Sequence, residues 1–433
     1  MKPETGPPLL QVRDLKTHFS LRGSFAQRLV GREAGSVKAV DGVSFDLRRG
    51  EVLGLVGESG SGKTTLGRTI LRLVEPTSGT IDFKGQELVG LTEREFRPLR
   101  RRMQMVFQDP HASLNPAMDL LTAVGHPLIV QGVAKSVDDT VAAVRKVLEL
   151  VGLVPVDQFM LKYPSDLSGG QKQRAVLARA VITNPELLVA DEPVSMLDMS
   201  VRAKILELML QLKTELDLTY LYITHDLATA KFFCDRIAIM YLGRIVEFGS
   251  TERIFGDPKH PYTVALLKAI PDPDPSRSIP VDLPRGEVPD AVRPPLGCPF
   301  HPRCPRAFEP CGWESRDLRD QLEARWTRLP EEDFERERGV VGDLEALEAE
   351  STVAHVPAGK GHDAHEVRAL LDAMRADDPD EPMWRGVAGT AVEGEAVRVD
   401  FREPVEPALT PVEGVEVACH LFDGHVAGTL DTA

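Results

Sequence analysis

Long hydrophobic runs are missing from this sequence of 433 residues. No stretch comes near the roughly 18 consecutive apolar residues that a transmembrane helix requires. The start of the chain, MKPETGPP, also lacks the apolar core of a secretory signal peptide. We therefore expect a chain that has no membrane span of its own and acts in the cytoplasm.

Cysteine is scarce, and positive charge is outweighed by negative charge. Five cysteines in a cytoplasmic chain do not indicate a disulfide framework. The formal net charge is −15, and residues 313–433 alone hold 29 acidic against 12 basic residues. The acidity therefore belongs to the last part of the chain, and it argues against nucleic acid as a general partner.

Chain length and proline distribution indicate more than one structural unit. The length exceeds that of a single hydrophobic core. Eight prolines between residues 271 and 295 indicate a linker-like crossing. We place the first unit at residues 1–255, an extension with a cysteine cluster at 256–312, and an acidic insertion and tail at 313–433. In the last part, helix-prone stretches at 343–350 and 365–374 predict a small helical cap.

The strongest local signal is GESGSGKT at residues 57–64, which fits the pattern G-x-x-x-x-G-K-[ST]. An apolar strand expected over 51–56 precedes it and a helix expected over 65–73 follows, which is the context of a phosphate-binding loop. Glycines allow the loop to point its N–H groups at phosphate oxygens, beside the positive end of the helix. Lys63 is expected to reach the β- and γ-phosphates, and the Thr64 hydroxyl to bind Mg²⁺. The residues expected to contact ATP here are Gly57, Ser59, Gly60, Ser61, Gly62, Lys63, Thr64 and Thr65.

Helices and strands alternate over the second half of the first unit, which argues for a mainly parallel sheet covered by helices. The expected strands lie at 186–190, 219–223 and 236–240. The first of them ends in two carboxylates, Asp191 and Glu192. Asp191 is suited to hold Mg²⁺ and Glu192 to polarise an attacking water.

Four further segments narrow the class. The segment LSGGQ at 167–171 opens an expected helix, and Ser168 lies 23 residues before Asp191. It resembles the signature of the ATP-binding cassette (ABC) family, and the other motifs stand in the family's order. Gln108 in FQDP matches the glutamine loop, SMLD at 195–198 the dimer-contact loop, and His225 in THD the switch histidine. Residues 8–255 are therefore similar to an ABC ATPase.

This resemblance implies an α/β P-loop NTPase fold with a mainly parallel sheet, an antiparallel β subdomain and a helical subdomain at about residues 92–170, followed by the cysteine-containing extension. It implies ATP and Mg²⁺ as cofactors, with Thr64, Gln108 and Asp191 around the metal. The catalytic residues would be Glu192, His225, Gln108 and Lys63.

In the family, the signature of one subunit closes on the phosphate loop of another. The residues implied to contact ATP across such a dimer are Ser168, Gly169, Gly170, Gln171 and Asp198. Adenine would stack on Phe19, although a place in the core is an equally good interpretation of this side chain.

Beyond the cassette, the chain resembles the ATPase subunits of oligopeptide, dipeptide and nickel importers. The residues that carry this likeness are QDPHASLNP at 108–116, HPYT at 260–263 and the cysteine-containing segment 297–311. It implies a peripheral subunit at the cytoplasmic face of the membrane that hydrolyses ATP to ADP and phosphate during peptide uptake. Its partners would be two permease subunits, gripped by the helical insert after Gln108, a substrate-binding protein, and a second ABC ATPase that is either a copy or a related chain.

Three cysteines, Cys298, Cys304 and Cys311, lie in a proline-rich segment whose loop could wrap a metal ion. Cys419 resembles the family's closing cysteine, displaced by a long insertion. Four thiolates suit either a [4Fe–4S] cluster, which the resemblance favours, or zinc, and a loop without metal is the remaining interpretation.

Two other classes of function remain open. A soluble ABC ATPase of translation or DNA repair would carry two cassettes or a long coiled coil, and neither is present. A metal or redox sensor would use the cysteine site as its working part.

Overall fold

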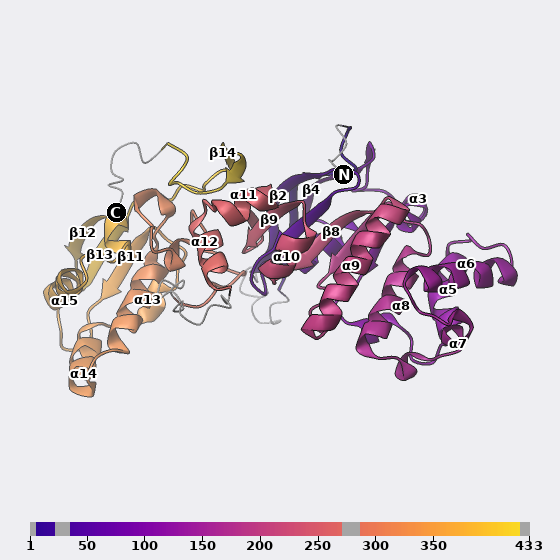
Figure 1. Ribbon diagram of the computed structural model, residues 1–433. Coiled ribbons are helices and arrows are strands. Elements are labelled where there is room, and N and C mark those ends of the chain that lie inside the picture. Colours follow the sequence, from indigo (N-terminus) through magenta and orange to yellow (C-terminus); the bar gives the residue numbers. More distant parts are fainter. Residues whose placement is uncertain (1–5, 22–34, 271–285, 425–433) are drawn as a thin grey trace. The chain divides into compact units, whose positions relative to one another are not determined.

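The computed structural model describes residues 6–21, 35–270 and 286–424 (Figure 1). Most of the proline-rich crossing expected from residue 271 onward lies outside these ranges. The chain forms two compact units. The described residues of the first are 6–21 and 38–256, and those of the second are 35–37, 257–270 and 286–424. In the ranges described, no helix combines the length and apolar character needed to cross a bilayer.

The main sheet of the first unit has the order β10-β9-β3-β8-β7-β6. Its strands are β3 (Val52–Val56), β6 (Met103–Val106), β7 (Leu187–Asp191), β8 (Thr219–Thr224), β9 (Arg236–Tyr241) and β10 (Arg244–Ser250). Five of them run parallel, and β10 pairs antiparallel with β9. Every residue of β3, β7 and β8 is buried, as expected for strands covered by helices on both faces. The α/β fold predicted from the alternation is thus confirmed, with a mixed main sheet.

Helices pack against this sheet on both sides. They are α2 (Lys63–Ile70), α8 (Gly169–Val181), α9 (Met199–Leu216), α10 (Leu227–Phe233) and α11 (Thr251–Gly256). A Cβ atom on Gly67 of α2 would lie 2.8 Å from Ile223 and 3.0 Å from Val189. Glycine at this position therefore lets α2 approach β7 and β8 closely, which brings the start of α2 to the carboxyl ends of these strands.

A second, antiparallel sheet has the order β2-β1-β4-β5. Its strands are β1 (Leu10–Ser20), β2 (Ser36–Leu47), β4 (Ser78–Phe83) and β5 (Gln86–Glu87). Leu10 pairs with Phe83 and Val12 with Ile81, and all four side chains are buried. This is the antiparallel β subdomain that the resemblance implied.

A group of helices follows β5: α3 (Glu93–Phe96), α4 (Pro110–Ser113), α5 (Leu120–Val130), α6 (Val137–Leu150) and α7 (Val156–Met160). Asp119 and Ser136 cap α5 and α6 by accepting hydrogen bonds from backbone N–H groups of the first turn. The expected helical region is not helical throughout, because β6 lies inside it and joins the main sheet beside β7.

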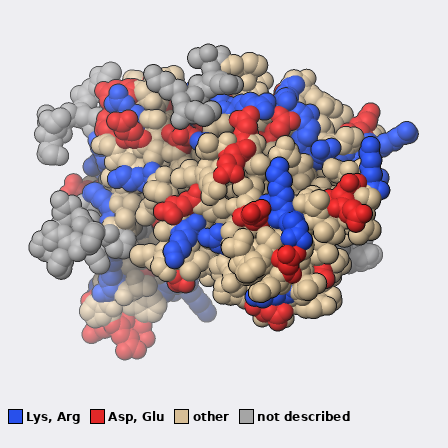
Figure 2. Space-filling view, turned by 45° about the vertical axis from the view of Figure 1, so that its right-hand side comes forward, with Lys and Arg blue, Asp and Glu red and all other residues tan. Residues whose placement is uncertain are grey.

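On the face shown in Figure 2, basic and acidic side chains are interspersed.

The second unit contains α12 (Pro261–Lys268), α13 (Ser315–Trp326), α14 (Glu331–Val340), α15 (Ala364–Asp377) and α16 (Met383–Gly386). Its strands are β11 (Val353–Pro357), β12 (Val387–Glu393), β13 (Ala396–Phe401) and the hairpin β14 (Thr410–Val412) and β15 (Val415–Val417). An antiparallel sheet of order β11-β13-β12 lies beside α15 (Figure 1).

The predicted helical cap is therefore confirmed only in part, because the unit also contains this sheet. Residues 365–374 do form a helix, but 343–350 contain only a short 3-10 turn at Leu344–Leu347. The sheet was missed although Val397, Val399 and Phe401 alternate with more exposed neighbours in β13, as a half-buried strand requires.

Candidate nucleotide-binding site

The phosphate loop joins the end of β3 to the start of α2. Two of its glycines are required by close backbone approach. A Cβ atom on Gly57 would lie 2.2 Å from the carbonyl oxygen of Met240, and one on Gly62 would lie 2.0 Å from that of Ala39. Gly62 also has a φ of 96°, in the left-handed region. The sequence pattern therefore corresponds to a loop held tightly between neighbouring strands.

Lys63 is buried and folds back onto its own loop. Its Nζ donates hydrogen bonds to the carbonyl oxygens of Gly57 (2.8 Å) and Glu58 (2.7 Å) and to Oγ of Ser61 (3.0 Å). Burial lowers the pKa of Lys63 to about 8, and nearby carboxylates oppose this shift. The ammonium group therefore bonds to oxygen atoms of the phosphate loop itself.

Thr64 and Asp191 lie together at the carboxyl end of β7. The Thr64 hydroxyl donates a hydrogen bond of 2.9 Å to Oδ1 of Asp191. Burial raises the pKa of the Asp191 carboxyl group, and the bond from Thr64 opposes the rise. A hydroxyl and a carboxylate are oxygen ligands of the kind that Mg²⁺ prefers.

Glu192 is the centre of a second cluster. Oε2 accepts a hydrogen bond of 3.0 Å from Nε2 of Gln108, and Oε1 lies 3.0 Å from Nδ1 of His225. These residues follow β6, β7 and β8, three neighbouring strands whose carboxyl ends meet at one edge of the sheet, where α/β proteins bind ligands. The backbone of Glu192 has a φ of 46°, a conformation that residues other than glycine rarely adopt. Gln108 contacts Glu192 here and makes no hydrogen bond to Thr64 or Asp191 in the described residues.

The signature turn lies at the start of α8. Ser168 caps the helix by accepting from the N–H of Gln171 (3.4 Å), whose Oε1 accepts in turn from the N–H of Ser168 (3.0 Å). Gly170 packs against Val201 of α9, which a Cβ atom would approach to 2.7 Å. Ser168 and Gly169 are exposed, as is Asp198, which caps α9. Within the described chain, no hydrogen bond joins this turn to the phosphate loop.

Phe19 lies on β1 with 42% of its surface exposed, so it is not a core side chain. Of the two interpretations left open by the sequence, the structure excludes burial in the hydrophobic core.

One small cavity in the second unit is lined by all four cysteines of the predicted metal site, which are Cys298, Cys304 and Cys311 of the extension and Cys419 of the tail. Cys298, Cys311 and Cys419 are buried, and Cys304 is partly exposed. Burial raises the pKa of the Cys304 and Cys311 thiols to about 12. The described residues nevertheless contain no group of three or more His, Cys, Asp or Glu side chains placed to hold a metal ion. The thiols share a cavity without the spacing of metal ligands, and the metal site stays a prediction.

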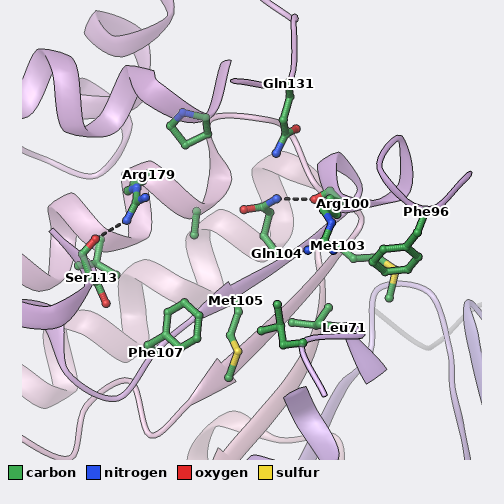
Figure 3. Close-up of a pocket in the computed structure, with 14 residues that line it drawn as sticks. Leu71, Phe96, Arg100, Met103, Gln104, Met105, Phe107, Ser113, Gln131 and Arg179 are labelled. Atoms are coloured by element: carbon green, nitrogen blue, oxygen red, sulfur yellow. Dashed lines mark hydrogen bonds between the residues drawn. The ribbon is translucent and has the colours of Figure 1, made fainter. Parts of the chain in front are cut away.

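A separate cavity of about 240 Å³ lies beside β6, with residues of α3, α5 and α8 in its lining (Figure 3). Apolar side chains, among them Phe96, Met103 and Phe107, form much of its lining. Gln131 Oε1 and Arg100 Nε are buried there without a hydrogen-bond partner in the described part of the chain. Sequence analysis did not single out these residues, because their apolar members follow the same pattern as core residues.

Comparison with known proteins defines the class. The family of ABC transporters matches residues 40–195, and the C-terminal region of oligopeptide/dipeptide transporters matches residues 246–311. Oligopeptide transport ATP-binding protein AppF of Bacillus subtilis is 45% identical over 306 residues, 70% of this chain and 91% of that protein. OppF of Salmonella typhimurium is 42% identical over 305 residues, 70% of this chain and 90% of that protein. An ATP-binding protein of Brucella ovis is 46% identical over 316 residues, 73% of this chain and 95% of that protein.

The fold, the phosphate loop and the matched residues define an ABC transporter ATPase. Within that class, the chain belongs to the ATP-binding proteins of the oligopeptide/dipeptide transporter family. Neither matched family region covers residues 312–433, which include α13–α16 and the sheet β11-β13-β12.

Proposed function

We propose that this chain hydrolyses ATP to drive uptake of oligopeptides or dipeptides through separate membrane permease subunits. The names of the AppF and OppF relatives and the match of the extension to oligopeptide/dipeptide transporters support the cargo class. The observation that carries the ATPase activity is the contact of Glu192 with both Gln108 and His225, next to the Thr64–Asp191 pair.

In the proposed reaction the phosphate loop binds the triphosphate through its N–H groups. Lys63 leaves the carbonyl oxygens of Gly57 and Glu58 and pairs with the β- and γ-phosphates. Thr64 and Asp191 hold Mg²⁺, with Gln108 completing that set, and bound Mg²⁺ offsets charge on the phosphate oxygens. Because Thr64 and Asp191 are already in contact, and Glu192 is already held by its neighbours, this part of the site is proposed to act through preorganised electrostatics.

Glu192 orients and polarises the attacking water in this proposal. Its carboxylate is engaged by Gln108 and His225, so these two contacts also fix its orientation. His225 is more exposed than Glu192, 56% against 16% for the side chains, and can therefore turn toward a γ-phosphate. Phe19 is proposed to stack on adenine, since its ring is exposed.

Hydrolysis is proposed to require a second ATPase subunit, either a copy or a related chain. The exposed signature turn makes no hydrogen bond to the phosphate loop in the described residues of its own chain. It is therefore free to donate hydrogen bonds to a triphosphate held by the partner, aided by the N-terminal end of α8. The residues proposed for this contact are Ser168, Gly169, Gly170, Gln171 and Asp198.

The cavity of Figure 3 is proposed to receive a short amphipathic helix of a permease subunit. Its lining offers apolar side chains together with the unpartnered Gln131 Oε1 and Arg100 Nε, which suit a helix that carries both apolar and polar groups. The chain would then lie peripherally at the cytoplasmic face of the membrane, with a substrate-binding protein on the other side of the complex.

Cys298, Cys304, Cys311 and Cys419 are proposed to hold a [4Fe–4S] cluster, with zinc as the alternative. The four thiols support the proposal because they line one cavity, which His260, His301 and His420 also line. Binding would require the thiols to close around the group. Iron and sulfide analysis of anaerobically purified protein tests it. A stable preparation without bound metal would contradict both the iron–sulfur cluster and the zinc site.

The test of the transport function is purification of the tagged chain from membranes with its associated proteins. We expect permease subunits and ATP hydrolysis that rises when the complex is reconstituted with a peptide-loaded binding protein. Recovery of active ATPase without any membrane subunit would instead favour a soluble role.

A further inference from the structure

A large charged cavity lies in the second unit, and its lining shares no residue with that of the cysteine cavity. It has a volume of about 890 Å³ and runs along α13, with residues 286–290 among its other walls. This volume is in the range of cavities that bind small organic molecules. Nine carboxylate side chains and five arginines line it, so the cavity carries an excess of negative charge.

Most of these charges already have partners. Arg319 donates to Glu323 (2.9 Å) and to Glu348 (2.7 Å), and Arg316 donates to Oε1 of Glu314 (2.5 Å). Oδ2 of Asp317 accepts from the N–H of Glu314 at 2.8 Å. Ion pairs and hydrogen bonds therefore hold most of the charged side chains of the cavity in place. The charged groups that lack such a partner are the ones available to bind a ligand.

Glu314 supplies one such group. Its side chain is 2% exposed, yet Oε2 has no hydrogen-bond partner among the residues that the structure describes. The backbone N–H of Asp317, in the first turn of α13, donates to the Glu314 carbonyl oxygen (3.1 Å). A buried carboxylate oxygen without a donor is unfavourable, which points to a donor supplied from outside the chain.

Asp320 supplies a second group, one turn and a half further along the same helix. No hydrogen bond or ion pair holds its carboxylate in the described ranges, and the residue lines the cavity with its side chain exposed. Desolvation by the cavity wall and the neighbouring carboxylates of Asp317 and Glu323 raise the pKa of Asp320 to about 6. A cation in the cavity would relieve that repulsion.

We propose that this cavity binds a small organic cation with primary ammonium groups, which donate hydrogen bonds to Glu314 and Asp320. An ammonium group offers three donors, which suit the unpartnered Oε2 of Glu314 and the carboxylate of Asp320. A metal ion fits less well, because no three His, Cys, Asp or Glu side chains of the described chain are gathered to hold one. The carboxylates are dispersed along the helix, which suits an extended molecule with separated charges.

The proposal is tested by calorimetric titration of the full-length chain with spermidine, an extended triamine, at physiological salt concentration. A neutral glycol of similar length serves as the matched compound. We expect saturable binding of one spermidine per chain and no binding of the glycol.

The variants Glu314→Gln and Asp320→Asn should each weaken spermidine binding by about tenfold or more, because each removes a charged acceptor. The exposed Glu332 of α14 lies outside the cavity lining, and Glu332→Gln should leave binding unchanged. If Glu314→Gln does not fold, Asp320→Asn still decides, since its side chain is at the cavity surface. No saturable binding to the unaltered chain, or equal weakening by all three variants, would overturn the proposal.

Discussion

Oε1 of Glu192 lies 3.0 Å from Nδ1 of His225, although the two residues are 33 positions apart in the sequence. The same carboxylate accepts a hydrogen bond from Gln108, which is 84 positions away. Three loops at the carboxyl ends of neighbouring strands thus converge on one acid. This convergence makes Glu192 the residue whose substitution is most informative.

Replacement of Glu192 by Gln should preserve ATP binding and lower turnover by at least about a hundredfold. The amide keeps the size and the contact distance of the side chain but loses the negative charge that polarises water. Phosphate release in the steady state and equilibrium ATP binding measure the two effects. Normal hydrolysis by the purified variant, assembled with its partners, would refute the role proposed for Glu192.

ATP affinity should fall as the pH rises above about 8. The pKa of Lys63 in the free protein is lowered to about 8, so the amine is charged below this pH and neutral above it. ATP binds the charged form, and binding at higher pH must therefore be coupled to proton uptake. The slope should approach a tenfold loss of affinity per pH unit.

Nucleotide titrations between pH 7 and pH 10 would measure this dependence. In Lys63→Met the affinity should be low at every pH and the slope above pH 8 should disappear. An unchanged slope in this variant would assign the titration to another group.

The two loop glycines Gly60 and Gly62 should differ in their tolerance of alanine. Both have positive φ, but a Cβ atom on Gly60 meets nothing within 4 Å, whereas one on Gly62 would lie 2.0 Å from the Ala39 carbonyl oxygen. Gly60→Ala should cost about 1 kcal/mol from backbone strain alone. Gly62→Ala should cost several kcal/mol or distort the loop. Urea denaturation and ATP binding measure both, and equal effects would contradict the close approach at Gly62.

Arg325 should stabilise the second unit, because it joins three helices. Its guanidinium group binds both carboxylate oxygens of Glu337 at 2.8 Å and Asp377 at 2.8 Å. Arg325→Ala should lower the free energy of unfolding by about 1 to 3 kcal/mol, since Glu337 is left buried without this partner. Arg336→Ala, which removes an exposed pair with Asp333, should change it by less than about 1 kcal/mol. Urea denaturation, monitored with a probe in the second unit, compares the free energies of unfolding of the two variants.

The local parts of the nucleotide site were predictable from the sequence. The phosphate loop and the Asp191–Glu192 pair are contiguous patterns, each next to a strand or helix with clear apolar periodicity. The resemblance to ABC ATPases then supplied Gln108, the signature turn and His225. No sequence pattern indicates that Gln108 contacts Glu192 and not Thr64 or Asp191, because these contacts depend on side-chain geometry at the sheet edge.

The second unit was less predictable. Its three-stranded sheet was missed because β11, β12 and β13 are short and pair antiparallel with one another, so their stability comes from pairing and not from local preference. The unpartnered oxygen of Glu314 has no signature in the chain at all. This unpartnered oxygen results from the way α13 packs in the folded unit. Only the folded unit shows which carboxylates form ion pairs with arginines.

The order of residues by itself determined the class of this protein, since a loop that binds phosphate needs particular small and charged residues at adjacent positions. Tertiary structure alone decided which distant side chains contact Glu192 and which carboxylate oxygens of the charged cavity lack a hydrogen-bond partner. The physical reason is that backbone conformation is encoded over a few neighbouring residues, whereas charges and hydrogen bonds are matched across the whole packed unit.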